Sequence, residues 1–219
     1  MGEEQARRRY ERAHDPSRVL TLSDGVYAII ITLLVLEIHV PDLAGGESLR
    51  TALQQVRPSF TAFLISFVVV AIAWVGHRDI FALIRRTDRP LVWLNIVYLL
   101  PLCILPFGAS PISRYERTPV GLRIYGLLLL AIAATRLWVW WYATGRPHLL
   151  FEPVERRSRR WGVALVAVPG AIYGVGIVVA NAAPTLSIVI YAAVPVLYVV
   201  TTAFARGTAP PGSTEPEFT

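Results

Sequence analysis

Long apolar runs separated by short polar segments make up most of the chain. A transmembrane helix needs about 20 predominantly apolar residues, and six runs approach or exceed that length. The six runs cover residues 19–40, 59–84, 91–107, 120–142, 161–180 and 185–204. Proline, glycine and charged residues fill the segments between them, as is typical of turns and loops. The pattern predicts an all-α polytopic membrane protein with six transmembrane helices in each subunit.

The two ends of the chain are polar. Residues 1–17 are rich in charge, which does not fit a cleavable signal peptide. The last segment is rich in Pro, Gly, Ser and Thr, a composition typical of disorder. We expect three parts: a cytoplasmic N-terminal segment at 1–17, a six-helix transmembrane domain at 18–206 and a disordered cytoplasmic tail at 207–219.

The arginines predict the orientation of the chain in the membrane. With an even number of spans, 14 of the 21 basic residues lie on the side of both termini and five lie on the other side. Positively charged loops stay in the cytoplasm, so both termini are expected there. The two remaining arginines, Arg78 and Arg136, fall within spans, where we expect them to snorkel or pair. The arginine-rich loop at 143–160 either sets topology only or also contacts anionic lipid.

Composition excludes several other classes of protein. Only 16% of residues are charged, against roughly 25% in a soluble domain. The net charge of +6 does not indicate a nucleic-acid partner, because the arginines lie between apolar spans. One cysteine, Cys103, and four scattered histidines give no metal site, and no catalytic motif is present. We therefore expect neither an enzyme nor a cofactor. A T-V-G-Y-G potassium filter is also absent.

The first span carries a polar pair, Ser23 and Asp24. A carboxylate inside a span is costly and normally has a partner. A carboxylate near a helix N-terminus is also stabilised by the helix dipole, so both explanations of Asp24 remain open.

An aliphatic stripe runs along the same span. At about 100° per residue, five side chains share one face: Ile29, Thr32, Leu33, Leu36 and Val40. Leu22 and Arg18 continue this face toward the N-terminus. Asp24 points about 140° away from Ile29, toward the other helices of its own subunit. Periodicity alone is equally well explained by ordinary helix packing.

Several motifs resemble a known family. The first span reads Arg18-x-x-x-Leu22-Ser23-Asp24, and the second contains Trp74-x-x-His77-Arg-x-x-Phe81. The later matching residues are Asp88, Asn95, Pro101, Pro106 and Phe107. These segments resemble the lysosomal potassium channel family, transmembrane protein 175, and its prokaryotic homologues. That family's first-helix signature is Arg-x-x-x-Phe-Ser-Asp, so Leu22 replaces the usual Phe. The resemblance covers roughly the first half of the chain.

The resemblance implies a potassium-permeable cation channel in a bacterial plasma membrane. Members with one six-helix repeat form homotetramers whose first helices line the pore. By motif position, Ile29 forms the narrowest ring, Leu33 and Leu36 form further rings, and Thr32 forms a polar ring. The family's Ser-Asp pair is held in a polar network within one subunit. The corresponding residues here are Arg18, Ser23, Asp24, His77 and Trp74.

A ring of four isoleucines can close a pore by dewetting, without a charged gate. Glu37 either attracts cations or simply lies at the lipid interface. His77 is either a structural hydrogen-bond partner or a pH-sensitive group.

Two other functions remain as alternatives. A proton-coupled secondary transporter would use Asp24 and His77, whereas a non-transporting scaffold would use the 143–160 loop.

Overall fold

The computed structural model describes residues 14–38, 48–114 and 118–206. Within them the chain is helical, with one short 3-10 turn, η1 (Pro147–Leu149), and an isolated bridge between Ile84 and Leu150. The α-helices are α2 (Ser17–Leu36), α3 (Leu49–Ala82), α4 (Arg89–Arg114), α5 (Pro119–Thr144), α6 (Arg156–Val179) and α7 (Pro184–Arg206). Residues 1–13, Val40 and the predicted tail at 207–219 lie outside the described residues.

The helices have the composition of membrane spans. Five of them are long and apolar enough to cross a bilayer, and a shorter apolar segment, Pro184–Val199, forms most of α7. The prediction of an all-α, multi-pass membrane protein is confirmed. The sixth crossing stays a prediction.

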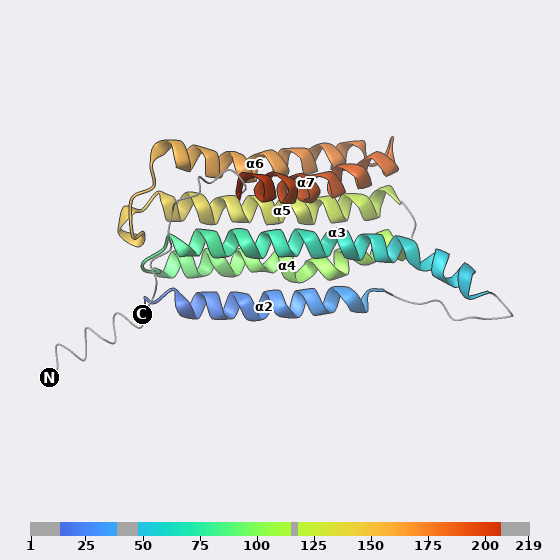
Figure 1. The fold of residues 1–219 in the computed structure, drawn as a ribbon, viewed down its shortest axis with the longest axis horizontal. Coiled ribbons are helices and arrows are strands. Elements are labelled where there is room, and N and C mark those ends of the chain that lie inside the picture. The colour runs from blue at the N-terminus through green and yellow to red at the C-terminus, as the bar shows by residue number, and fades with distance from the viewer. Residues whose placement is uncertain (1–13, 39–47, 115–117, 207–219) are drawn as a thin grey trace.

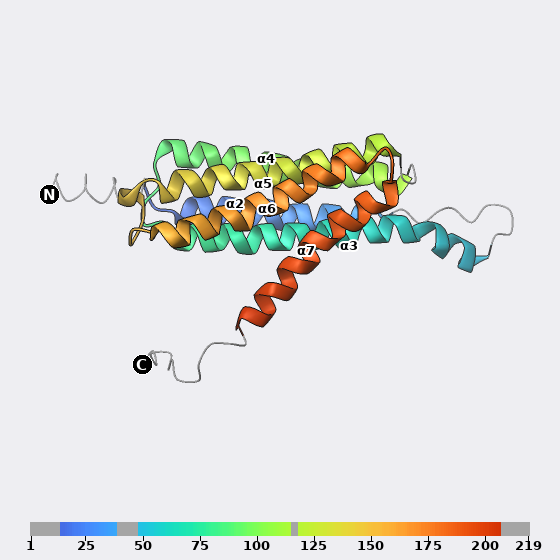
Figure 2. The ribbon, with the colours of Figure 1, turned by 90° about the horizontal axis from the view of Figure 1, so that it is seen from above.

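The helices run alternately up and down in an elongated bundle (Figure 1). α2 lies along one edge and packs against α3 and α4, whereas α6 lies on the opposite side of the bundle (Figure 1). α5 packs on both α4 and α6. α7 packs on α6 and α3 and then leaves the bundle obliquely (Figure 2).

Three connections meet at one end of the bundle. The backbone N–H of Arg85, after α3, donates to the carbonyl of Leu149 at 2.7 Å, and the N–H of Thr87 donates to that of His14 at 2.8 Å. The start of α2, the α3–α4 turn and the α5–α6 loop are therefore joined. The arginines at 85, 86, 89, 156, 157, 159 and 160 belong to this end, so much of the positive charge is concentrated there.

Two helices begin five or more residues earlier than the hydropathy pattern predicts. α3 begins at Leu49 rather than at residue 59, and it contains Pro58 in its interior. α6 begins at Arg156 rather than at residue 161. The residues added to α3 include Leu, Ala and Gln, and four of the five residues added to α6 are Arg. All of these are good helix formers, which can extend a helix beyond its apolar span.

Small residues bring α5, α6 and α7 close together. Tyr191 of α7 is buried, and its hydroxyl donates to the carbonyl of Leu122 on α5 at 3.1 Å. Gly126 of α5 and Gly176 of α6 lie directly against the Tyr191 side chain. Ser187 donates to the Gly176 carbonyl at 2.8 Å, which fastens α7 to α6. Close approach at small residues is a common way for helices to associate in a membrane.

This packing predicts opposite effects for two glycines on α6. A methyl group at Gly176 would meet the Tyr191 ring, so Gly176→Ala should lower the thermal unfolding temperature in detergent through overpacking of about 1–3 kcal/mol. Gly174 has no atom within 4 Å of an added Cβ, so Gly174→Ala should be neutral or stabilising by up to about 1 kcal/mol. Equal melting temperatures for the two variants would contradict this account of the α6–α7 contact.

Candidate pore helix and polar network

α2 has two distinct faces. Its buried residues are Val19, Ser23, Tyr27, Ile30 and Leu34, and this face packs against α3 and α4. Three of the predicted ring residues are instead exposed in the single chain: Ile29 is 59% exposed, Leu33 42% and Leu36 67%. Thr32 and Leu22 are exposed as well. The predicted stripe therefore lies on the face that the subunit does not cover.

A hydrogen-bonded chain crosses the buried face of α2. Ser23 Oγ donates to the carbonyl of Val19 at 2.8 Å. The same oxygen accepts a hydrogen bond from Asn95 Nδ2 of α4 at 3.0 Å. Asn95 Oδ1 then lies 2.7 Å from His77 Nε2 of α3. Since an amide oxygen can only accept, His77 donates from Nε2. The chain of bonds thus joins α2, α4 and α3 and fixes the tautomer of His77.

Aromatic rings enclose this histidine. His77 is only 1% exposed, and its ring stacks on Phe81 at 4.4 Å and on Tyr98 at 5.6 Å between centroids. The Tyr98 hydroxyl donates its only proton to the carbonyl of Ala73 at 3.2 Å. In its 2.6 Å hydrogen bond with Tyr27, Tyr98 is therefore the acceptor and Tyr27 is the donor. His77 Nδ1 is buried without a hydrogen-bond partner among the described residues. The ring thus packs between aromatic side chains and makes its one described side-chain hydrogen bond to Asn95.

Asp24 belongs to a second, separate contact. Trp74 Nε1 of α3 donates to Asp24 Oδ1 at 2.8 Å, while the Asp24 side chain stays exposed. As the helical geometry predicts, the carboxylate faces another helix of its own subunit. Arg18 is exposed in the first turn of α2, away from both contacts. The five predicted network residues thus divide into a Ser23–His77 chain, a Trp74–Asp24 pair and an outlying Arg18.

The two arginines within spans are accommodated differently. Arg78 lies 3.4 Å from Asp79 and 5.6 Å from the centre of the Trp74 ring, so it pairs as expected. The guanidinium of Arg136 on α5 rests on Gly76 of α3, where any side chain would collide with it.

Sequence reasoning missed the residue that joins the network. The sequence identifies Asn95 only as a match to the family pattern and does not predict its contact with Ser23 and His77. A single amide in the apolar run 91–107 was the available signal, because an unpaired amide in a membrane is costly. Tyr27 and Tyr98 gave no comparable signal, since tyrosines are common in such spans.

Two carboxylates order the arginine-rich end of the bundle. Asp15 Oδ1 accepts from the backbone N–H of Ser17 at 2.9 Å, and this bond lowers the pKa of Asp15 below its ordinary value. Asp88 accepts from the N–H of Leu91 at 2.9 Å and from the Tyr142 hydroxyl at 2.8 Å. Asp88 therefore caps α4 and ties it to α5.

Among residues 14–38, 48–114 and 118–206, no group of three potential ligands could hold a metal ion.

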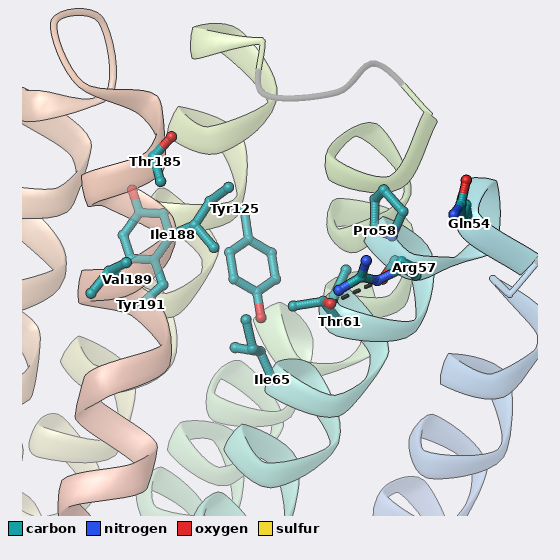
Figure 3. A pocket seen from close by; sticks show the side chains of 11 residues that line it. Gln54, Arg57, Pro58, Thr61, Ile65, Tyr125, Thr185, Ile188, Val189 and Tyr191 are labelled. Carbon is teal, nitrogen blue, oxygen red and sulfur yellow. Dashed lines mark hydrogen bonds between the residues drawn. The ribbon is translucent and has the colours of Figure 1, made fainter.

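A cavity of about 630 Å³ lies elsewhere in the bundle, between α3, α5 and α7 (Figure 3). Its lining includes Tyr125, Ile188 and Tyr191, with Arg57 as its charged member. The Tyr125 hydroxyl is bonded to Ser66 at 2.9 Å. No α2 residue lines this cavity, so it is not part of the exposed stripe.

Comparison with known proteins gives this geometry a family context. A family model described as the endosomal/lysosomal potassium channel TMEM175 matches residues 18–106. A potassium channel of Streptomyces collinus is 35% identical over 151 residues, which cover 67% of this chain and 73% of that protein. The chain belongs to the TMEM175 family. The resemblance seen in the first three spans is thereby confirmed.

Other TMEM175 relatives extend the match to the fold. The crystal structure of a lysosomal potassium-selective channel TMEM175 homologue from Chamaesiphon minutus superposes with a TM-score of 0.75 and 28% identity. The superposition covers 88% of this chain and 98% of that one. A human protein named an endosomal/lysosomal proton channel, TMEM175, is 26% identical over 65% of this chain and 29% of its own length.

The amide bridge generates a stability prediction. Asn95→Leu keeps a similar volume but leaves Ser23 and His77 without this partner, which should cost about 1–3 kcal/mol. We expect a melting temperature in detergent that is lower by several degrees. Asn181, exposed in the α6–α7 turn, offers the matched control, and Asn181→Leu should change little. A stable Asn95→Leu protein would show that the bridge is dispensable for docking α2.

Proposed function

We propose that four copies of this chain form a potassium-permeable cation channel whose pore is lined by α2. The observation that carries the proposal is the bare aliphatic face of α2 in a chain of the TMEM175 family. Ile29, Leu33 and Leu36 are exposed although five other residues of the same helix are buried: Val19, Ser23, Tyr27, Ile30 and Leu34. A central position among four copies would cover this face, with the remaining helices outside it.

In the proposed pore, Ile29 forms the narrowest ring, and Leu33 and Leu36 form wider hydrophobic rings. Thr32 adds hydroxyl oxygens between them. Its proton is donated to the carbonyl of Ile29 at 2.8 Å, so its oxygen presents lone pairs to a passing cation. Aliphatic rings supply no oxygen ligands to replace a hydration shell, so we expect only modest selectivity for potassium over sodium.

Such rings would close the pore by excluding water. A hydrophobic constriction empties when it is narrow and wets when it widens slightly, so a small movement of α2 is enough to open it. Ser23 and Asp24 would set the resting position of the helix through Asn95 and Trp74. Potassium is the permeant ion, and the mechanism requires no cofactor.

The orientation of the proposed channel follows from charge. The arginine-rich end of the bundle would face the cytoplasm of a bacterial cell, with six crossings and both termini on that side. Glu37, half-buried just after α2, would then lie near the outer mouth.

The structure gives less support to a proton-coupled transporter. The hydrogen bonds of Asp24 and of His77 are not connected to each other, and the donor to Asp24 is the indole N–H of Trp74. An indole cannot accept a proton and pass it on. A relay from Asp24 to His77 therefore lacks a continuous path through the contacts described above.

The channel proposal is tested by ion flux into liposomes that contain the purified protein. We expect potassium-driven flux, smaller but measurable sodium flux, and an oligomer of four 24.3 kDa chains. Folded and correctly inserted protein that passes neither ion would refute the proposal and favour a scaffold. Strict coupling of flux to a proton gradient would favour the transporter.

A substitution on the stripe tests the constriction itself. Ile29→Asn should raise resting potassium leak, because four amides at the narrowest ring would hold water there. Val35→Asn is a matched control on the same helix, since Val35 is exposed but points about 120° away from Ile29. Unchanged or reduced flux in Ile29→Asn would place the gate elsewhere, as would an equal increase in both variants.

A further inference from the structure

A second exposed feature lies on the opposite side of the bundle from α2. Arg156, Arg159, Arg160 and Val163 follow one another at helical spacing and share one face of α6. Together with Trp141 of α5 they line a hollow of about 530 Å³. Four of its five lining residues are thus cationic or aromatic, at the end of the bundle where the α5–α6 loop turns.

This hollow continues along the two helices into the apolar span. A second hollow of about 300 Å³ is lined by Ala134, Leu137, Trp138, Trp141 and Val163. Trp141 and Val163 belong to both hollows, so the two form one groove between α5 and α6. The groove has a cationic head and an apolar tail directed toward the middle of the membrane.

Local contacts hold the cationic head in place. The carbonyl of Arg159 accepts from Trp140 Nε1 at 3.3 Å, and Gly162 lies directly against the Trp140 ring. Gly145 leaves room for the Arg159 guanidinium, since an added Cβ would lie 3.3 Å from its Nη2. Arg146 is not part of the groove, because it stacks on the Tyr142 ring at 3.6 Å.

The head of the groove carries positive charge that no lining group neutralises. No carboxylate lines either hollow, and the described ion pairs include none of the three arginines. Arginine guanidinium groups bind phosphate through charge-assisted, often bidentate hydrogen bonds. Tryptophan side chains favour the interface between headgroups and acyl chains, which is the depth that Trp138 and Trp141 would mark.

We propose that this groove binds one anionic phospholipid of the surrounding leaflet. The headgroup phosphate pairs with Arg156, Arg159 and Arg160, and an acyl chain lies along Leu137, Trp138 and Val163. The continuous apolar tail selects a lipid over a free phosphate ion, which would occupy the head alone. The site is separate from α2 and does not depend on the proposed channel function.

Native mass spectrometry of the purified full-length protein, titrated with phosphatidylglycerol or phosphatidylcholine, tests the proposal. We expect preferential binding of phosphatidylglycerol. The triple variant R156Q/R159Q/R160Q should weaken it roughly a hundredfold, since each arginine near an anionic lipid contributes about fivefold. The matched control R85Q/R86Q/R157Q removes three exposed arginines at the same end, outside the groove, and should bind almost as well as the unmodified protein.

Two further measurements distinguish lipid from other occupants. Val163→Trp fills the groove between head and tail, so it should weaken phosphatidylglycerol binding although every arginine remains. Inorganic phosphate should not displace the lipid. Displacement of the lipid by phosphate would show that the groove binds free anions. Equal loss of phosphatidylglycerol binding in both triple variants would show that general surface charge attracts the lipid. A changed oligomeric state in R156Q/R159Q/R160Q or Val163→Trp would show that this face is a contact between subunits. Each of these three results would overturn the proposal.

Discussion

The amide of Asn95 joins three helices, and because its side chain is buried, water does not compete for its hydrogen bonds. In a bilayer, apolar contact between helices gains little, because lipid chains are as apolar as the helices themselves. Docking of α2 therefore depends on shape and on hydrogen bonds. Ser23 already donates to its own helix, so Asn95 must present its NH₂ group to Ser23 and its oxygen to His77. One amide orientation satisfies all three residues.

This bridge also sets the rotation of α2. With Ser23 turned toward Asn95, helical geometry places Ile29 about 120° and Leu36 about 140° away from Ser23, on the side that the subunit leaves exposed. The outward half of the helix also carries a line of small residues, Thr21, Gly25, Ala28 and Thr32, beside the larger aliphatic side chains. Small residues allow close approach of helices in a membrane, so in the proposed tetramer one surface would supply both a contact for neighbouring copies and the bulky residues of the rings.

Much of this arrangement could be predicted from sequence because it follows from periodicity. The spans arise from the length of apolar runs, and the exposed stripe arises from the 3.6-residue repeat. The starts of α3 at Leu49 and α6 at Arg156 could not be predicted, because helix propensity extends both helices into polar sequence. The role of Asn95 was also out of reach, since it depends on which helices become neighbours.

Two hydrogen bonds to neighbouring helices restrict α2 in different ways. Ser23 and Asp24 are adjacent, yet one is bonded to α4 and the other to α3. A rotation of α2 about its axis would break both bonds, at a cost of about 1–3 kcal/mol. A tilt that pivots near these residues would preserve both. Displacement in a tilt grows with distance from the pivot, at 1.5 Å of helix per residue, so Leu36 would move further than Ile29. In the proposed pore, the rings of Leu33 and Leu36 would widen more than the ring of Ile29, so Ile29 would remain the main barrier to water.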